Sequence, residues 1–173
     1  MSILEPLKID LKGLDEGLTQ FRFSLDDGFF EAVDAQEVRC GKVEATLRVQ
    51  RLDEVFTLDF HTEGIVTIPC DLCLDDMEQP VMTDNRLMVK FGEESDEDDD
   101  WIVVSEDEGV LDTSWFIYEF IALAIPIKHV HAPGTCNVAM TEKLKELSAA
   151  RSSDVDDVAV VDSRWSALKN LKF

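Results

Sequence analysis

The cysteines at positions 70 and 73 are the residues of this sequence best placed to do chemistry. They lie in the stretch Ile-Pro-Cys-Asp-Leu-Cys-Leu at 68–74. A Cys-x-x-Cys spacing lets both thiols reach one metal ion or each other, and the amides of the intervening turn can stabilise a thiolate. Cys70 and Cys73 are therefore candidates for half of a tetrahedral zinc site or for a dithiol pair.

A tetrahedral zinc site needs two further ligands, and the loop at 126–136 is the most attractive source of them. It contains proline and glycine, so it can turn an imidazole and a thiol toward one ion. We select His131 and Cys136 from it, with His129, Cys40 and His61 as further candidates. Three hypotheses stay open for the cysteines: a structural zinc site, reduced buried thiols, or a redox dithiol.

Alternation of apolar and polar residues on both sides of the cysteine pair predicts antiparallel strands that meet in a thiol-bearing turn. In the segment 54–68 the apolar residues Val55, Leu58 and Phe60 do not keep one period, which predicts a slipped register or a bulge. Strands are expected at 1–12, 18–25, 41–50, 54–68, 81–91 and 101–104.

Three- and four-residue spacing of apolar residues predicts the main helix at 112–125, which Pro126 ends. Glu119 is its one interior charge and is expected on the exposed face. A shorter helix is expected at 141–148. Residues 162–171 predict a short C-terminal helix on which Trp165, Leu168 and Leu171 share one face, suited to docking on the body or on a partner.

Composition and charge limit the classes of function. The 173 residues fit one domain, 1–173, with a mobile acidic loop at 93–100 and a linker near 151–157 before the C-terminal helix. The formal net charge of -21 disfavours non-specific attraction to nucleic-acid phosphates and favours a basic protein partner. No apolar run is long enough to span a bilayer and no leader pattern is present, so we expect a cytoplasmic protein without a membrane partner.

Catalytic signatures are missing from the sequence. It holds no glycine-rich nucleotide-binding motif, no Gly-x-Ser-x-Gly and no His-Glu-x-x-His. Its many carboxylates are scattered, and solvation of the surface explains most of them. We therefore expect a protein that is not an enzyme.

Three segments together resemble the YceD family, the large ribosomal RNA subunit accumulation proteins. They are Cys-x-x-Cys-Leu at 70–74, the Glu-containing helical segment from Glu119 to Pro126, and Asp-x-Arg-Trp-x-x-Leu-x-x-Leu at 162–171. Cys136 matches a later cysteine of many relatives, whereas Leu72 stands where the family commonly has Arg between the cysteines. The resemblance implies a non-enzymatic factor in large-subunit ribosome biogenesis, with a ribosomal or rRNA-processing protein as partner and pre-rRNA met indirectly or by a local contact.

Taken together, the sequence predicts an α+β fold. An antiparallel sheet that could curve into a barrel-like form is packed by one main helix, with the Cys-x-x-Cys turn at one end. Two other functions stay open beside the ribosomal one: a zinc-stabilised protein-interaction module unrelated to ribosomes, and a dithiol redox protein that uses Cys70 and Cys73.

Overall fold

The computed structural model describes residues 3–34, 37–92 and 101–147. The predicted acidic loop at 93–100, the linker near 151–157 and the C-terminal helix lie outside these residues. In chain order the elements are η1 (Glu5–Leu7), β1 (Lys8–Asp10), β2 (Gly17–Leu25), α1 (Asp27–Val33), β3 (Cys40–Leu52), β4 (Val55–Pro69), β5 (Asp76–Gly92), β6 (Ile102–Ser105), β7 (Val110–Asp112), α2 (Ser114–Leu123) and α3 (Val138–Leu147).

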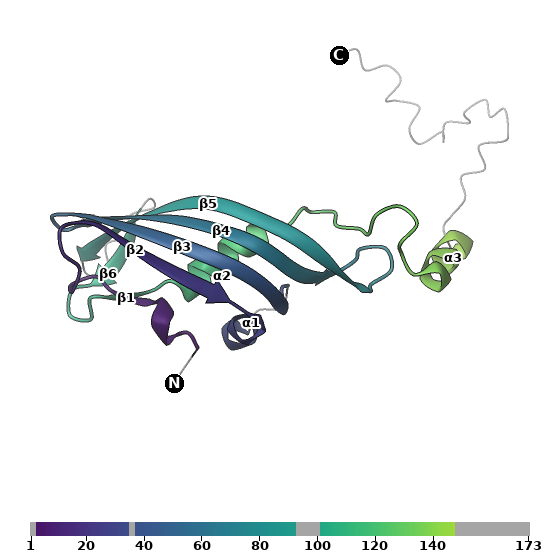
Figure 1. Ribbon diagram of the computed structural model, residues 1–173, viewed down its shortest axis with the longest axis horizontal. Coiled ribbons are helices and arrows are strands. Elements are labelled where there is room, and N and C mark those ends of the chain that lie inside the picture. The colour runs from purple at the N-terminus through teal and green to yellow at the C-terminus, as the bar shows by residue number, and fades with distance from the viewer. Residues whose placement is uncertain (1–2, 35–36, 93–100, 148–173) are drawn as a thin grey trace, which may run out of the picture.

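The fold is α+β, as predicted, and is built on one long, twisted sheet (Figure 1). Its strand order is β2-β3-β4-β5-β6, and successive strands from β2 to β5 are antiparallel. The sheet curves but stays open, because β2 and β6 are its two edges in the described part of the chain. The expected strand at 101–104 is present as β6, but it runs parallel to β5 rather than continuing the antiparallel order.

The central strands keep one unbroken register, so the predicted bulge in the 54–68 segment is wrong. Pairing between β3 and β4 runs from Leu52 opposite Val55 to Cys40 opposite Thr67 without an extra residue. The error came from taking Val55 as an inward residue, whereas the buried face begins at Phe56 and continues at every second position. Strict alternation then places one side of β4 in the core and the other on the surface.

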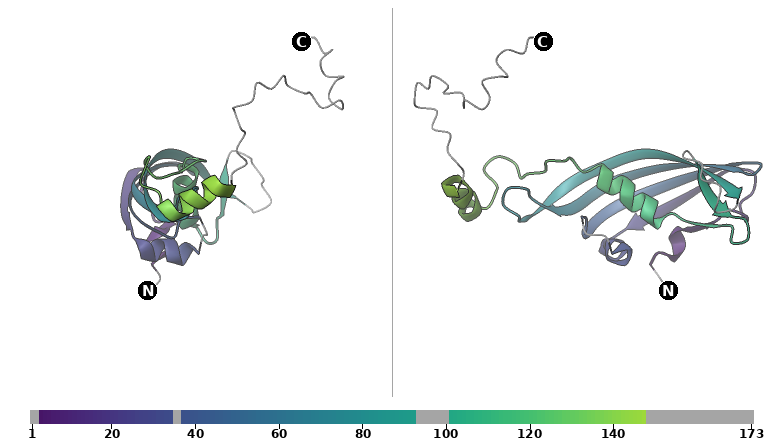
Figure 2. Two further views of the ribbon diagram at one scale, coloured as in Figure 1. Left: turned by 90° about the vertical axis from the view of Figure 1, so that its right-hand side faces the viewer. Right: turned by 180° about the vertical axis from the view of Figure 1, so that it is seen from behind.

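Helix α2 covers the inner face of the sheet and corresponds to the main helix expected at 112–125 (Figure 2, right). Ile117 and Ile121 are fully buried, and Phe120 meets Phe60 of β4 edge to face, with ring centroids 5.3 Å apart. Burying each such side chain stabilises the fold by roughly 1.5–3 kcal/mol. The contacts fix α2 along the strands, so the loop that follows it is carried toward the turn between β4 and β5.

The N-terminal segment differs from the strand expected at 1–12. Pro6 lies in the first turn of η1, where its missing N–H costs nothing, so only Lys8–Asp10 is extended. This short β1 pairs with β7 instead of joining the main sheet. The pairing holds the start of α2, because the Thr113 hydroxyl donates to the carbonyl oxygen of Leu7 at 2.7 Å.

The two remaining helices are short. Helix α1 was not predicted; the Asp26 carboxylate accepts a hydrogen bond from the Gly28 N–H at its start, and Phe29 and Phe30 are buried. Helix α3 covers most of the segment expected at 141–148 and begins earlier, at Val138. No helix in the described ranges is long and apolar enough to cross a membrane.

Candidate metal centre

The turn at 70–75 joins β4 to β5 and directs two thiols to one side. The Cys70 N–H donates to the Asp75 carbonyl oxygen and the Leu74 N–H donates to the Cys70 carbonyl oxygen, each at 2.9 Å. Leu74 has a φ of 62°, which lets the chain reverse within this short loop. Because both hydrogen bonds close the turn on itself, Cys70 and Cys73 are held on a fixed backbone.

The loop after α2 is fastened to this turn by a reciprocal pair of hydrogen bonds. The Asp71 N–H donates to the carbonyl oxygen of His129 at 2.9 Å, and the His129 N–H donates to the Asp71 carboxylate at 2.8 Å. These two hydrogen bonds fix the path of the loop. As a result His131 and Cys136, two and seven residues after His129, face the turn. Asp71 thus acts as a clamp that the sequence analysis did not identify.

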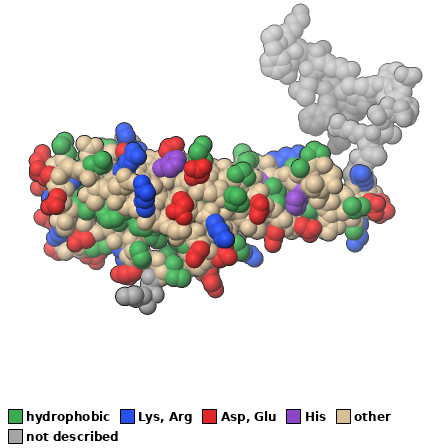
Figure 3. Space-filling model, in the orientation of Figure 1, with side chains coloured by type: hydrophobic (Ala, Val, Ile, Leu, Met, Phe, Trp, Pro, Cys, Tyr) green, Lys and Arg blue, Asp and Glu red, His purple; other side chains and the backbone are tan. Residues whose placement is uncertain are grey.

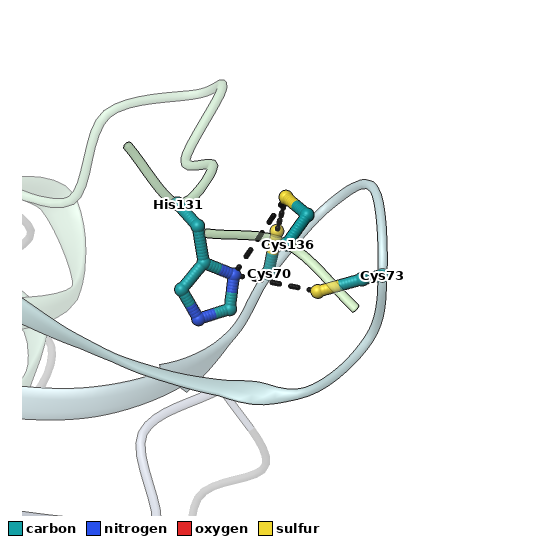
Figure 4. A group of neighbouring side chains, drawn as sticks. All are labelled: Cys70, Cys73, His131 and Cys136. Atoms are coloured by element: carbon teal, nitrogen blue, oxygen red, sulfur yellow. Dashed lines mark hydrogen bonds between the residues drawn. The ribbon is translucent and has the colours of Figure 1, made fainter. Parts of the chain in front are cut away.

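The two segments bring four potential ligands together (Figure 4). The Sγ atoms of Cys70, Cys73 and Cys136 and one ring nitrogen of His131 all lie within 4.8 Å of one another. Cys70 and Cys73 are buried, whereas His131 and Cys136 are partly exposed. All four residues selected from the sequence therefore meet at one place, and the cysteines are free thiols.

The spacing of these atoms suits one tetrahedral ion. The Sγ atoms of Cys70 and Cys136 are 3.9 Å apart, and His131 Nδ1 lies 3.3 Å from Cys73 Sγ and 3.9 Å from Cys136 Sγ. Tetrahedral zinc with ordinary bond lengths separates two sulfur ligands by about 3.8 Å and a sulfur from a nitrogen by about 3.6 Å. A disulfide would need sulfurs about 2.05 Å apart. The cluster could thus bind a metal ion with little rearrangement.

The imidazole of His131 is held in the form that a metal requires. Its Nε2 lies 3.3 Å from the carbonyl oxygen of Asp76, and because a carbonyl can only accept, this contact places the ring proton on Nε2. Nδ1, which faces the thiols, then keeps its lone pair. Histidine ligands in metal sites are usually oriented by such a hydrogen bond from the second nitrogen.

The cluster divides the thiols by their acidity. Burial opposes ionisation of Cys70, but hydrogen bonds from the backbone N–H groups of Cys73, His131 and Leu72 outweigh it and lower the pKa of Cys70 to about 6. Burial and the neighbouring sulfurs of Cys70 and Cys73 raise the pKa of Cys136 to about 11. One thiolate is thus stabilised by the protein alone, whereas holding several together requires a cation.

The other candidate ligands lie outside the cluster. The His129 ring contacts the carbonyl oxygen of Pro126 and the Asp71 carboxylate. On the outer face of the sheet, His61 Nδ1 of β4 lies 2.7 Å from a carboxylate oxygen of Asp84 on the neighbouring strand β5. Cys40 is exposed at the start of β3.

The segment that carries the cluster also matches a known protein family. The family model described as large ribosomal RNA subunit accumulation protein YceD matches residues 58–172. The chain belongs to the YceD family. No curated protein and no solved structure matched the chain.

The part shared with the YceD family begins within β4 and includes the whole candidate metal centre, since Cys70, Cys73, His131 and Cys136 all lie between its limits. Helix α2 also lies within it. The predicted partner-binding residues Trp165, Leu168 and Leu171 fall in the matched range but outside the described residues.

Proposed function

We propose that this YceD-family protein is a non-enzymatic accessory factor for the accumulation of large-subunit rRNA during ribosome biogenesis. The observation that carries the proposal is the family match over 58–172, because the family is named for that role. The arrangement of the side chains suggests how the protein is held together. The residues best suited to chemistry form one compact thiol and imidazole cluster that resembles a structural metal site.

The proposed metal is zinc, held by Cys70, Cys73, His131 and Cys136. Three thiolates and one imidazole are a ligand set typical of structural zinc, and four protein ligands leave no open position for a substrate. Bound there, zinc would supply a crosslink between the β4–β5 turn and the loop after α2. The chain's own hydrogen bonds between Asp71 and His129 already align the two segments for it.

The charge of the chain supports a protein partner rather than extensive contact with RNA. With 37 acidic and 16 basic residues, its field repels phosphate at long range. The outer face of the sheet carries acidic and basic side chains interspersed rather than a basic stripe (Figure 3). We therefore propose that the factor acts by binding a basic ribosomal or rRNA-processing protein. It would contact RNA only indirectly or at a local site.

Depletion of the protein is expected to lower large-subunit rRNA relative to small-subunit rRNA, and expression of the wild-type chain is expected to restore the ratio. The measurement is quantitative analysis of both rRNAs with mapping of precursor ends. A Cys73→Ser variant is expected to rescue less well than a Cys40→Ser variant, because Cys40 is an exposed thiol outside the cluster. An unchanged ratio with normal precursor ends would contradict the proposal and favour an interaction module unrelated to ribosomes.

The lowered pKa of Cys70 also favours a second candidate, a dithiol redox protein, because a stabilised thiolate is the reactive form. The two hypotheses predict different responses to mild oxidation of the purified protein. If zinc occupies the cluster, mild oxidation of the zinc-loaded protein should leave the number of titratable thiols at Cys70, Cys73 and Cys136 unchanged. The same oxidation should lower that number only after a chelator has removed the zinc. Rapid formation of a Cys70–Cys73 disulfide in the zinc-loaded protein, detected by mass spectrometry, would support the redox function instead.

A further inference from the structure

Helix α2 carries exposed apolar side chains beside its single charge, Glu119, on the side that faces away from the sheet. Trp115 and Leu123 are 52% and 82% exposed, and Ile127 just beyond the helix is fully exposed. A surface helix normally presents mainly polar residues to solvent, so exposed Trp and Leu side chains on its outer side are unusual. Exposed apolar side chains grouped near one another commonly mark an interaction site.

This side of α2 lines two adjoining hollows. One, of about 460 Å³, is lined in part by Trp115 and Leu123, and the other, of about 340 Å³, lies beside Ile127. Glu37 and Ala122 line both, so the two hollows lie next to each other. We call the feature the α2 groove and define it by its main lining residues: Glu37, Trp115, Glu119, Ala122, Leu123 and Ile127.

The α2 groove ends beside the candidate metal centre. His129 lines the second hollow and is hydrogen-bonded to Asp71 in the Cys-x-x-Cys turn. Ile68 and Pro69, the last residues of β4 before that turn, line the same hollow. A metal that fixes the turn to the loop after α2 would therefore also fix one wall of the groove.

Among Asp, Glu, Lys and Arg side chains, only carboxylates line the groove in the described part of the chain. Asp34, Glu37 and Glu119 are exposed at its margin, and no Lys or Arg lines either hollow in the described part of the chain. The groove thus combines an apolar surface with negative charges at its margin. It complements a segment that offers apolar side chains on one face and Lys or Arg beside them.

We propose that the α2 groove binds a basic amphipathic segment of a partner protein. The partner's apolar side chains contact Trp115 and Leu123, and its Lys or Arg side chains pair with Glu37 and Glu119. Exposed Trp beside a pocket is the residue type that most often anchors such contacts. The inference deepens the proposed function, on which it rests only for the partner's identity as a ribosomal or rRNA-processing protein.

Charge distinguishes this occupant from the others. The carboxylates of Asp34, Glu37 and Glu119 would repel the phosphates of RNA. A second copy of this chain packed symmetrically through the same face would bring its carboxylates close to those of the first copy, which costs free energy. A basic segment of another protein gains from the same three charges.

Fluorescence of Trp115 in the full chain tests the proposal. Replacing Trp101 and Trp165 with Phe leaves Trp115 as the single tryptophan. The probe is a synthetic amphipathic peptide of Leu and Lys, about 14 residues or four helical turns long. We expect saturable binding with a shift of Trp115 emission to shorter wavelength, weakened by salt, and no binding of the matched peptide in which Glu replaces every Lys.

A matched pair of variants locates the binding. Leu123→Lys should weaken binding of the Leu/Lys peptide at least ~10-fold, the loss expected when a central contact of ~1.4 kcal/mol is removed. Leu18→Lys adds the same charge at a leucine that is also exposed, at 68%, but lies on β2. It should change the affinity less than ~2-fold, since rim and remote charges contribute little.

Three outcomes would overturn the proposal: equal affinity for the Leu/Lys and Leu/Glu peptides, equal weakening by both leucine variants, or no binding at all. In the last case, a chain that keeps only Trp165 shows whether Leu123→Lys alters its emission. Such a change would assign the groove to the chain's own C-terminal residues instead.

Failure of the groove and failure of the proposed function give different results in cells. If wild-type protein restores the rRNA ratio and Leu123→Lys restores it equally, the groove proposal is overturned and the function stands. If depletion leaves the ratio unchanged, the proposed function fails, while peptide binding at Trp115 still decides whether the groove takes a basic segment.

Discussion

Replacing Cys73 with serine is expected to release one equivalent of zinc and to lower the melting temperature by roughly 8–16 °C. Cys73 is buried, and its Sγ lies 3.3 Å from His131 Nδ1, so its loss leaves three ligands at a site built for four. A metal present at about 1,000 times its dissociation constant stabilises the folded state by about 4 kcal/mol. For a chain of this size each kcal/mol corresponds to roughly 2–4 °C.

Two measurements separate a metal effect from a packing effect. Elemental analysis gives zinc per chain, and thermal denaturation is recorded with and without a chelator. The chelator should lower the melting temperature of the wild-type protein to near that of Cys73→Ser and should leave the variant unchanged. Cys40→Ser, at an exposed thiol outside the cluster, should keep both the zinc and the stability.

Zinc retained at one equivalent by Cys73→Ser would refute the ligand assignment. A wild-type protein that binds no zinc and shows no response to the chelator would support the hypothesis of reduced buried thiols. The His131→Ala variant adds an independent check, because it removes the nitrogen ligand and keeps all three thiols. It should weaken zinc binding without changing the number of titratable thiols.

The parts of the fold that could be predicted are those determined by local spacing. Alternating residues in β3, such as Val43, Leu47 and Val49, are buried, because successive side chains of a strand point to opposite faces. Helix α2 was predicted from its three- and four-residue spacing and from Pro126, which ends it. The Cys-x-x-Cys turn is equally local, since two residues are enough to bring both thiols to one side.

The choice between His129 and His131 depends on contacts distant in sequence. The two histidines are separated by one residue on the same loop, and spacing alone makes either a possible ligand. The reciprocal hydrogen bonds between Asp71 and His129 orient the loop so that His131 meets the thiols. These contacts join residues 58 positions apart. They therefore form only when the rest of the fold brings the two segments together.

The missed elements have the same origin. The pairing of β1 with β7 and the contact of Thr113 with Leu7, 106 residues away, depend on the path of the whole chain. The α2 groove was missed because periodicity identifies a buried face but does not show that the opposite face also lacks cover. Trp115 shares the apolar spacing of this helix, yet its side chain is half exposed.

Replacing Gly64 with alanine is expected to destabilise the protein by at least ~3 kcal/mol, at the upper end of the cost of overpacking. Gly64 lies in β4, opposite Val43 of β3 and Val81 of β5. A β-carbon at position 64 would clash with the carbonyl oxygen of Lys42 and would lie 2.6 Å from the Cα of Val43. Both atoms belong to the backbone, so no side-chain rotation relieves the clash.

The expected result is a fall in melting temperature of roughly 6–12 °C. Ile65→Ala is the control, because Ile65 is the next residue of β4 and is 46% exposed, so its truncation should cost less than ~1 kcal/mol. A fall for Gly64→Ala no larger than that of the control would contradict the close approach of β3 to β4. Since β4 leads directly into Cys70, a shift of β4 at Gly64 should also weaken zinc binding, whereas Ile65→Ala should not.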